Sequence, residues 1–160
     1  MTSEEFRIAV SRNSHRLFLV AFSFTKSTYD AEDIVQNVFL KLWKYDKEFA
    51  GREHIDKWLT AVCVNESKNC IKSVFRSFQN IEDCQLASPD CFGDSSQQEL
   101  FNAVMELPKK YRTAVHLFYY EDLPIKEIAE LLGVKESAVK TRLSRARTKI
   151  KERLGERIDE

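Results

Sequence analysis

Apolar residues recur at helical intervals through three segments in the first half of the chain. The first segment opens with Thr2 and Glu5, which have the spacing of a capping box, and the third runs from about Ile55 to Phe75 after a break at Gly51. The inward positions of the three segments are Phe6, Val10, Leu17, Val20, Ala21 and Phe24; Ala31, Ile34, Val35, Val38, Phe39 and Leu42; and Ile55, Trp58, Leu59 and Val62. Each apolar stripe needs a partner, so the pattern predicts a compact three-helix domain over residues 1–76.

The helical pattern stops in the middle of the chain and returns as four shorter segments. Residues 77–98 contain a proline, a glycine, several serines and no positive charge, which is typical of an acidic flexible linker. From about Glu99 one helical segment runs to Pro108, and a second spans Tyr111–Tyr120. Two further stripes consist of Ile125, Ile128, Ala129 and Leu132, and of Val139, Leu143, Ala146 and Ile150. We therefore expect an all-α protein whose second domain has four helices over residues 99–160.

The last two of these segments have the spacing of a helix-turn-helix. Ala129, Gly133 and Val139 fall four and six residues apart, which suits a short helix, a tight turn at a glycine and a second helix crossing the first. Lys135 stands where a Ser, Thr, Asp or Asn cap would be expected. Either Ser137 caps the second helix one turn later, or packing holds the turn.

Composition excludes several classes of protein. The chain has 160 residues, of which 43% are hydrophobic and only four are glycine and three proline, so it can bury helical cores. It has no secretory signal and no apolar run of membrane-spanning length, so we expect a cytoplasmic protein without membrane insertion. Free thiols are the expected state of the four cysteines, with a redox or zinc pair of Cys84 and Cys91 as the alternative. No residue pattern indicates a catalytic site, a metal site or a cofactor.

Charge is distributed unevenly along a chain whose formal net charge is zero. Between Lys135 and Arg153, eight basic residues stand against Glu136 and Glu152, a local balance of +6. The apolar stripe of this helix faces the core, which leaves a basic surface for a nucleic acid. Base edges are within reach of Lys140, Thr141, Ser144 and Arg145, and DNA phosphates are within reach of Arg142, Arg147 and Lys149. The alternative is that this helix binds no nucleic acid and is only a charged helix in contact with solvent.

Two stretches resemble extracytoplasmic-function (group IV) sigma factors of the sigma-70 family. The stretch EIAELLGVKESAVKTRLSRARTKI resembles the DNA-reading end of their domain 4. The stretch YDAEDIVQNVFLKLWK, followed by DKWLTAVCVNESKNCIKS, resembles their domain 2. The two matches occur in the family's order and, apart from the linker, cover most of residues 5–155. The resemblance implies a protein that binds core RNA polymerase, reads the minus-thirty-five element with domain 4, and melts and reads the minus-ten element with domain 2.

The resemblance assigns roles to residues of domain 2. Asp33, Gln36 and Asn37 match the surface that binds the polymerase clamp coiled coil, although many relatives are acidic where Asn37 stands; Phe39 and Trp43 are assigned to the core. Asn65 matches the position that holds a flipped minus-ten base, and the loop from Phe49 to Ile55 matches the loop that forms its pocket. The basic residues at helical spacing from Asn65 supply a path for the strand; they are Lys68, Lys72 and Arg76. A favourable helix-dipole charge at Asp33 and simple solvation at Asn65 are the alternatives.

In domain 4 the resemblance matches Lys140, Thr141, Ser144 and Arg145 to base-contacting positions. Ala138 departs from the family, which often has threonine there, and this puts one phosphate contact in doubt. The implied partners are core RNA polymerase, through its clamp coiled coil and its flap, promoter DNA and an anti-sigma factor. Two other functions stay open at this stage: a free-standing helix-turn-helix regulator whose first domain dimerises or senses a ligand, and an adaptor that binds only protein.

Overall fold

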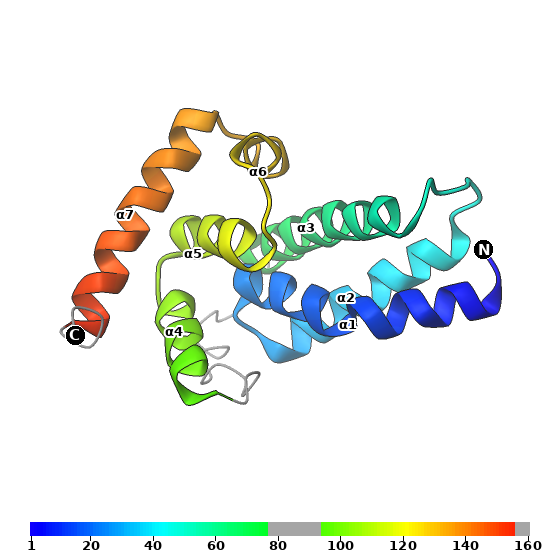
Figure 1. Ribbon diagram of the computed structural model, residues 1–160, viewed down its shortest axis with the longest axis horizontal. Coiled ribbons are helices and arrows are strands. Elements are labelled where there is room, and N and C mark those ends of the chain that lie inside the picture. The colour runs from blue at the N-terminus through cyan, green and yellow to red at the C-terminus, as the bar shows by residue number, and fades with distance from the viewer. Residues whose placement is uncertain (77–93, 156–160) are drawn as a thin grey trace. The chain divides into compact units, whose positions relative to one another are not determined.

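The computed structural model describes residues 1–76 and 94–155, apart from the side chains of 74–76 (Figure 1). The chain divides into two compact units, Met1–Leu86 and Ala87–Glu160. Every regular element of the described residues is helical, so the expected all-α fold is confirmed. Cys84, Cys91 and residues 77–93 of the expected linker lie outside the described residues.

The first unit is a bundle of three helices, α1 (Ser3–Thr25), α2 (Thr28–Lys44) and α3 (Arg52–Arg76), each of which packs against the other two. The capping box at the start of α1 is present, because Thr2 Oγ1 accepts from the Glu5 N–H and the Glu5 carboxylate accepts from the Thr2 N–H. Ser27 caps α2 by accepting from the Asp30 N–H. The core contains Leu17, Val20, Phe22, Ile34, Val38, Leu42, Leu59, Cys63 and Val64.

A polar network inside the first unit fixes α1 against α3. Arg16 donates to Asn13 Oδ1 at 2.7 Å on its own helix and to Thr60 Oγ1 at 2.6 Å and the Asp56 carbonyl at 3.2 Å on α3. Asn13 is buried and donates in turn to the Ala9 carbonyl at 2.9 Å. Burying a polar group without a hydrogen-bond partner costs free energy. Because this network pairs the buried groups in only one arrangement of α1 and α3, it favours that arrangement.

The second unit contains α4 (Ser95–Met105), α5 (Lys109–Val115), η2 (His116–Tyr120), α6 (Ile125–Leu132) and α7 (Glu136–Leu154). α4 begins four residues before the expected start at Glu99, because Asp94 Oδ1 accepts from the Ser96 N–H and caps the helix. The expected single helix over Tyr111–Tyr120 consists of α5 followed directly by the π-helical turn η2. The core contains Phe101, Val104, Met105, Leu117, Ile128, Val139, Leu143 and Ala146.

Candidate nucleic-acid interface

The turn between α6 and α7 has the geometry that the sequence spacing predicts. Gly133 adopts a left-handed conformation with φ of 70°, and its N–H bonds the Ala129 carbonyl, which ends α6. The next N–H, that of Val134, also donates to Ala129 O, at 3.0 Å. Ile128 and Ala129 are buried in α6, and Val139 is buried in α7. The two helices pack together, so the predicted helix-turn-helix is confirmed.

The first turn of α7 forms without a side-chain cap. Lys135 occupies the N-cap position with extended backbone and makes no side-chain cap hydrogen bond, and Ser137 lies inside the helix. Of the two alternatives for this turn, a cap by Ser137 one turn later is therefore not what occurs. The Lys135 carbonyl accepts from the Val139 N–H at 3.1 Å, and Val139 is fully buried. Backbone bonding and packing, instead of a cap, hold the first turn.

α7 turns its apolar residues inward and its polar residues outward. Val139, Leu143 and Ala146 are buried, whereas the four residues matched to base contacts are all exposed; they are Lys140, Thr141, Ser144 and Arg145. Each α-helical residue advances by about 100°, which places Arg142 and Lys149 on one flank of this exposed face and Arg147 on the other. The predicted phosphate contacts thus lie on both flanks of α7.

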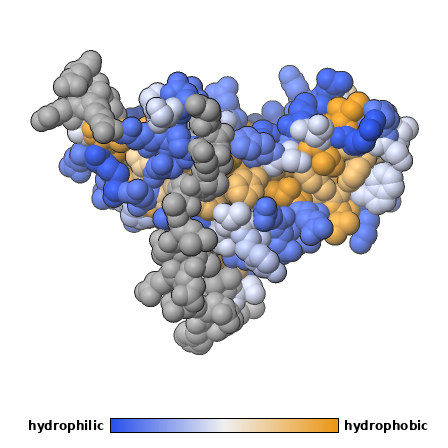
Figure 2. Space-filling view, turned by 90° about the horizontal axis from the view of Figure 1, so that it is seen from below, coloured by the Kyte–Doolittle hydropathy of each residue, from blue (hydrophilic) through white to orange (hydrophobic). Residues whose placement is uncertain are grey.

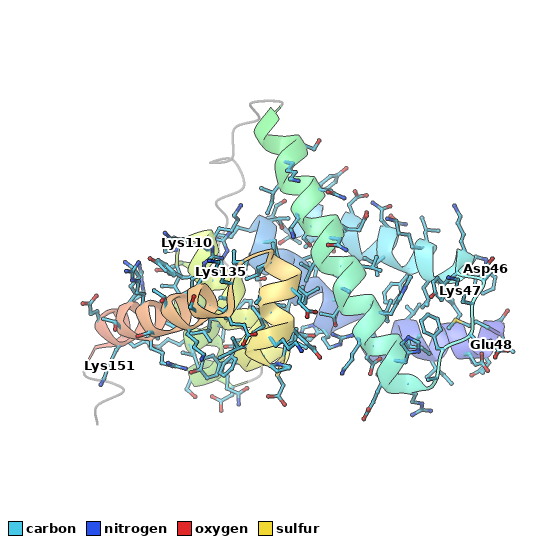
Figure 3. All side chains as sticks on the ribbon, turned by 90° about the horizontal axis from the view of Figure 1, so that it is seen from above. Asp46, Lys47, Glu48, Lys110, Lys135 and Lys151 are labelled. Carbon is cyan, nitrogen blue, oxygen red and sulfur yellow. The ribbon has the colours of Figure 1, made fainter. Side chains whose placement is uncertain are left out.

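A concave surface of about 360 Å³ runs along one flank of α7 and is called the basic groove here. It is lined by Lys110, Tyr111, Lys135, Ser137, Ala138, Thr141, Arg142 and Arg145, none of which is acidic. Figure 3 shows Lys110 and Lys135 close together and Lys151 towards the other end of α7. The structure thus brings Thr141, Arg142 and Arg145 together with two residues of α5 that sequence reasoning missed. The run Lys109-Lys110-Tyr111 after Pro108 was the available signal.

Arg147 lies along a different concavity, called the apolar groove here, with a volume of about 610 Å³. Its lining residues are Gln97, Leu100, Val104, Val115, Tyr119, Tyr120, Arg147, Ile150 and Lys151. Arg147 Nε donates to Tyr119 Oη at 2.7 Å, and its guanidinium carbon lies 5.8 Å from the Tyr119 ring centroid. The structure therefore does not bring Arg147 together with Arg142 and Arg145.

Several ionisable groups of α5 are perturbed by this environment. The neighbouring Arg145 guanidinium is the main cause that lowers the pKa of Tyr111, and the charges of Lys110 and Lys149 add smaller contributions in the same direction. Burial lowers the pKa of Arg112 to about 10, and that guanidinium donates to the Leu107 carbonyl at 3.0 Å. Burial and then the neighbouring Arg112 charge lower the pKa of Lys109. Positive charge is therefore concentrated at the start of α5 as well as along α7.

In the first unit the residues matched to polymerase binding lie on α2. Asp33 and Gln36 are exposed and Asn37 is half-buried. Leu40 is 50% exposed and Trp43 53% exposed, so the assignment of Trp43 to the core is wrong. One side of the Trp43 ring contacts Phe6 of α1, with centroids 4.9 Å apart, and the remainder faces solvent. Figure 2 shows orange hydrophobic residues among blue hydrophilic ones on one face of the molecule.

The residues matched to the minus-ten element lie on α3. Asn65 and Lys72 are exposed, Lys68 is half-buried, and the side chain of Arg76 lies outside the described residues. Before α3, the loop residues Tyr45 and Phe49 form an aromatic cluster with His54 and Trp58 of the helix: Phe49 lies 4.9 Å from Tyr45, 5.1 Å from His54 and 5.7 Å from Trp58, between ring centroids. The Ala50 N–H donates to His54 Nδ1 at 2.9 Å and fixes the loop. Sequence periodicity did not indicate this cluster.

Some candidate chemistry is not found in the described part of the chain. No group of three or more His, Cys, Asp or Glu side chains there has the arrangement of a metal site. Cys63 and Cys70 are free thiols. None of the described helices combines the length and the hydropathy that crossing a membrane requires.

Comparison with known proteins identifies both units. Residues 9–76 match the family model Sigma-70 region 2, and residues 97–150 match Sigma-70, region 4. The chain is 30% identical over 141 residues to RNA polymerase sigma factor SigV of Bacillus subtilis, covering 86% of this chain and 83% of that one. It is 24% identical over 157 residues to ECF RNA polymerase sigma factor SigW of Bacillus subtilis, covering 87% and 83%.

The fold has a counterpart among solved structures. The chain is similar to the sigma factor RpoE of Bartonella quintana in its co-crystal structure with the anti-sigma factor NepR. The TM-score is 0.72 at 24% sequence identity, over 94% of this chain and 97% of that chain. At this identity the likeness concerns the fold.

Proposed function

Because the chain belongs to the extracytoplasmic-function (ECF) sigma factors of the sigma-70 family, we propose that it binds core RNA polymerase in the cytoplasm and directs it to a set of promoters. The second unit reads the minus-thirty-five element and the first unit melts and reads the minus-ten element, without a catalytic site of its own. The observation that carries this proposal is the basic groove beside a helix-turn-helix, in a chain that also matches sigma region 2.

For the minus-thirty-five element we assign α7 to the major groove. Its outward residues Lys140, Thr141, Ser144 and Arg145 carry donors for base edges, and a bidentate arginine–guanine pair discriminates by about 1–3 kcal/mol. Arg142 and Lys149 on one flank and Arg147 on the other suit the two phosphate strands that border a major groove. For Arg147 this contact requires it to exchange the Tyr119 bond for a phosphate.

For the minus-ten element we assign α3 and the loop before it. Asn65 offers an exposed amide to an unstacked base, and Lys68, Lys72 and Arg76 follow it at helical spacing as a path for the strand. The aromatic cluster of Tyr45, Phe49 and Trp58 adds the ring faces on which single-stranded bases stack, worth about 1–3 kcal/mol each.

For polymerase binding we assign two surfaces. On α2, Asp33, Gln36 and Asn37 lie near Leu40, whose exposure supplies an apolar contact amid the polar ones for the clamp coiled coil. In the second unit, the apolar groove suits an apolar segment of the polymerase flap. Either surface is also available to an anti-sigma factor, which would then compete with polymerase. A free-standing regulator is not favoured, since regions 2 and 4 are both present.

The decisive experiment is transcription in vitro with core polymerase and genomic fragments. The wild-type protein should direct initiation at discrete promoters. Asp33→Arg should weaken capture of core polymerase, with Glu32→Ala as the control for an exposed neighbouring carboxylate on α2. If a variant loses promoter-directed transcripts but still binds polymerase, the substitution has affected DNA reading. Unaltered polymerase binding in Asp33→Arg and Gln36→Ala would refute the clamp assignment.

The DNA assignments are tested by separating base contacts from phosphate contacts. Arg145→Ala should relax promoter choice at one minus-thirty-five position, whereas Arg142→Ala should weaken binding evenly and reduce the salt dependence. Arg153→Ala removes a charge from the same helix beyond the groove and is the matched control. Asn65→Ala should impair strand opening, seen by permanganate, more than polymerase binding. Identical behaviour of the Arg145 and Arg142 variants across a promoter panel would contradict this sorting.

A further inference from the structure

Arg147 of α7 is bound to a tyrosine on the apolar groove, away from the other cations assigned to DNA. Its Nε donates to Tyr119 Oη at 2.7 Å, and its guanidinium carbon lies 5.8 Å from the centroid of the same ring. Both residues line the apolar groove, and none of the residues that line this groove is acidic. Within the groove, the phenol oxygen is therefore the acceptor that holds the guanidinium.

An unusual turn of the backbone places Tyr119 beside α7. The residue lies on η2, the π-helical turn in which the Glu121 N–H bonds the His116 carbonyl at 3.1 Å. Such turns are rare and frequently occur at functional sites. His116 and Leu117 of the same turn are fully buried, whereas Tyr119 is 52% exposed. The turn therefore anchors itself in the core and leaves the Tyr119 hydroxyl at the surface, where Arg147 reaches it.

The bond to Tyr119 competes with the phosphate contact that is assigned to Arg147. The side chain is exposed on one flank of α7, but its Nε is occupied and its guanidinium lies beside the tyrosine ring. A charge-assisted bond to a phosphate is stronger than a bond to a neutral phenol, so DNA can displace Tyr119. The displacement costs the free energy of the hydrogen bond that is lost, and this cost lowers the affinity for DNA.

We propose that Tyr119 is a positioning residue that holds Arg147 away from the DNA backbone, so that the Tyr119 hydroxyl lowers the affinity of the free chain for duplex DNA. The proposal rests on the proposed function, in which the outer face of α7 enters the major groove. Tyr119 acts only through Arg147 and contacts no DNA itself. Since Arg147 is assigned to a phosphate, the restraint acts equally on all sequences and leaves base choice unchanged.

The test removes the hydroxyl and keeps the ring. The full chain without polymerase is titrated with a promoter duplex and with an unrelated duplex at low ionic strength, where phosphate contacts are strongest. Tyr119→Phe should bind both duplexes about 2- to 10-fold more tightly than the wild type, the range expected for one hydrogen bond. In an Arg147→Ala background, the same substitution should change neither affinity. A merely structural role of the tyrosine predicts a loss of affinity instead of this gain.

Two further measurements accompany the titrations. Tyr29→Phe is the matched control, because it removes a hydroxyl from a tyrosine of α2 that is 81% exposed, and it should leave both affinities unchanged. NMR of the arginine Nε–H groups reports on the bond itself. The Arg147 Nε proton should exchange with water more slowly in the wild type than in Tyr119→Phe, because only the wild type offers it the phenol oxygen.

Four results would overturn the restraint by Tyr119: unchanged or weaker binding by Tyr119→Phe, a gain that persists in the Arg147→Ala background, a gain on the promoter duplex alone, or equal exchange of the Arg147 Nε proton. Arg142→Ala in the same titrations separates this failure from failure of the proposed function, because Arg142 lies on the other flank of α7. If Arg142→Ala weakens binding to both duplexes and Tyr119→Phe has no effect, only the restraint is refuted. If neither substitution alters affinity, the flanks of α7 do not contact DNA and both proposals fall.

Discussion

His116, on η2, is a buried histidine without polar partners. Its side chain is fully buried, neither ring nitrogen has a hydrogen-bond partner, and burial lowers its pKa to about 3 from the usual 6.5. The ring stacks on Tyr120 with centroids 5.0 Å apart, and it makes a T-shaped contact with the Phe101 ring at 6.4 Å between centroids. A proton on this imidazole would be buried among aromatic rings, so the folded second unit holds it neutral.

The difference in pKa makes the stability of the second unit depend on pH. Below pH 6.5 the unfolded chain binds a proton at this histidine that the folded chain does not, so stability falls as pH falls, until about pH 3. At 1.36 kcal/mol for each pH unit, the loss is about 2 kcal/mol by pH 5 and about 5 kcal/mol by pH 3. Above pH 6.5 this group contributes no pH dependence.

Substitution of His116 by phenylalanine should remove this dependence. Between pH 7 and pH 5 the wild-type second unit should lose about 2 kcal/mol more stability than the His116→Phe variant. At pH 7 the variant should be at least as stable, since two unpaired ring nitrogens are replaced by an apolar ring. Stability is measured by hydrogen exchange of α5 and η2 peptides in urea. Both tryptophans, Trp43 and Trp58, belong to the first unit, so their fluorescence follows that unit as an internal control.

The control variant His15→Gln alters an exposed histidine of α1 and should leave the exchange of the second unit unchanged. Equal pH dependence of exchange in wild-type and His116→Phe proteins would refute the reasoning. It would mean that protonated His116 reaches a hydrogen-bond partner or solvent. Protonation in the folded state would then cost much less free energy than the burial of the imidazole indicates.

Three substitutions test other features of the second unit, each measured by hydrogen exchange and thermal unfolding. Lys135→Ser should stabilise α7 by about 1 kcal/mol by supplying the missing cap, while weakening promoter binding because a cation of the basic groove is lost. Gly133→Ala should cost about 1 kcal/mol or more from its positive φ alone, since nothing lies within 4 Å of the added methyl. Arg153→Gln should change stability by less than about 1 kcal/mol, because both side chains of its ion pair with Glu106 are half-exposed. A stability change larger than the one given for a variant would contradict the assignment that the variant tests.

Local patterns sufficed for the elements of the fold. The helical periodicity of Ile34, Val38 and Leu42 and the capping box at Thr2 describe α2 and α1 as they occur. The start of α4 was missed because Asp94 caps a helix whose first turn, Ser-Ser-Gln-Gln, has no apolar residue to reveal a period. The start of α7 was uncertain because packing of Val139 replaces the cap that the sequence lacks.

The candidate site was less predictable than the helices that carry it. A helical projection separates the inward Val139 and Leu143 from the outward Thr141 and Arg145. The projection of α7 alone does not show which residues of other helices lie beside each of its flanks. The assignment of Trp43 to the core, which came from the resemblance, is wrong for a related reason: the packing of Phe6 covers only one side of the ring.

The sequence by itself determined the helices, the glycine turn at Gly133 and the concentration of charge on α7, because these depend on residues a few positions apart. Only the tertiary structure decided that Tyr111 and Arg145 line the same groove, while Tyr119 accepts a hydrogen bond from Arg147 on the other flank. Those pairs join residues about thirty positions apart, and their geometry depends on how α5, which η2 continues directly, packs against α7. Periodicity carries no information about that packing, because it describes each helix alone.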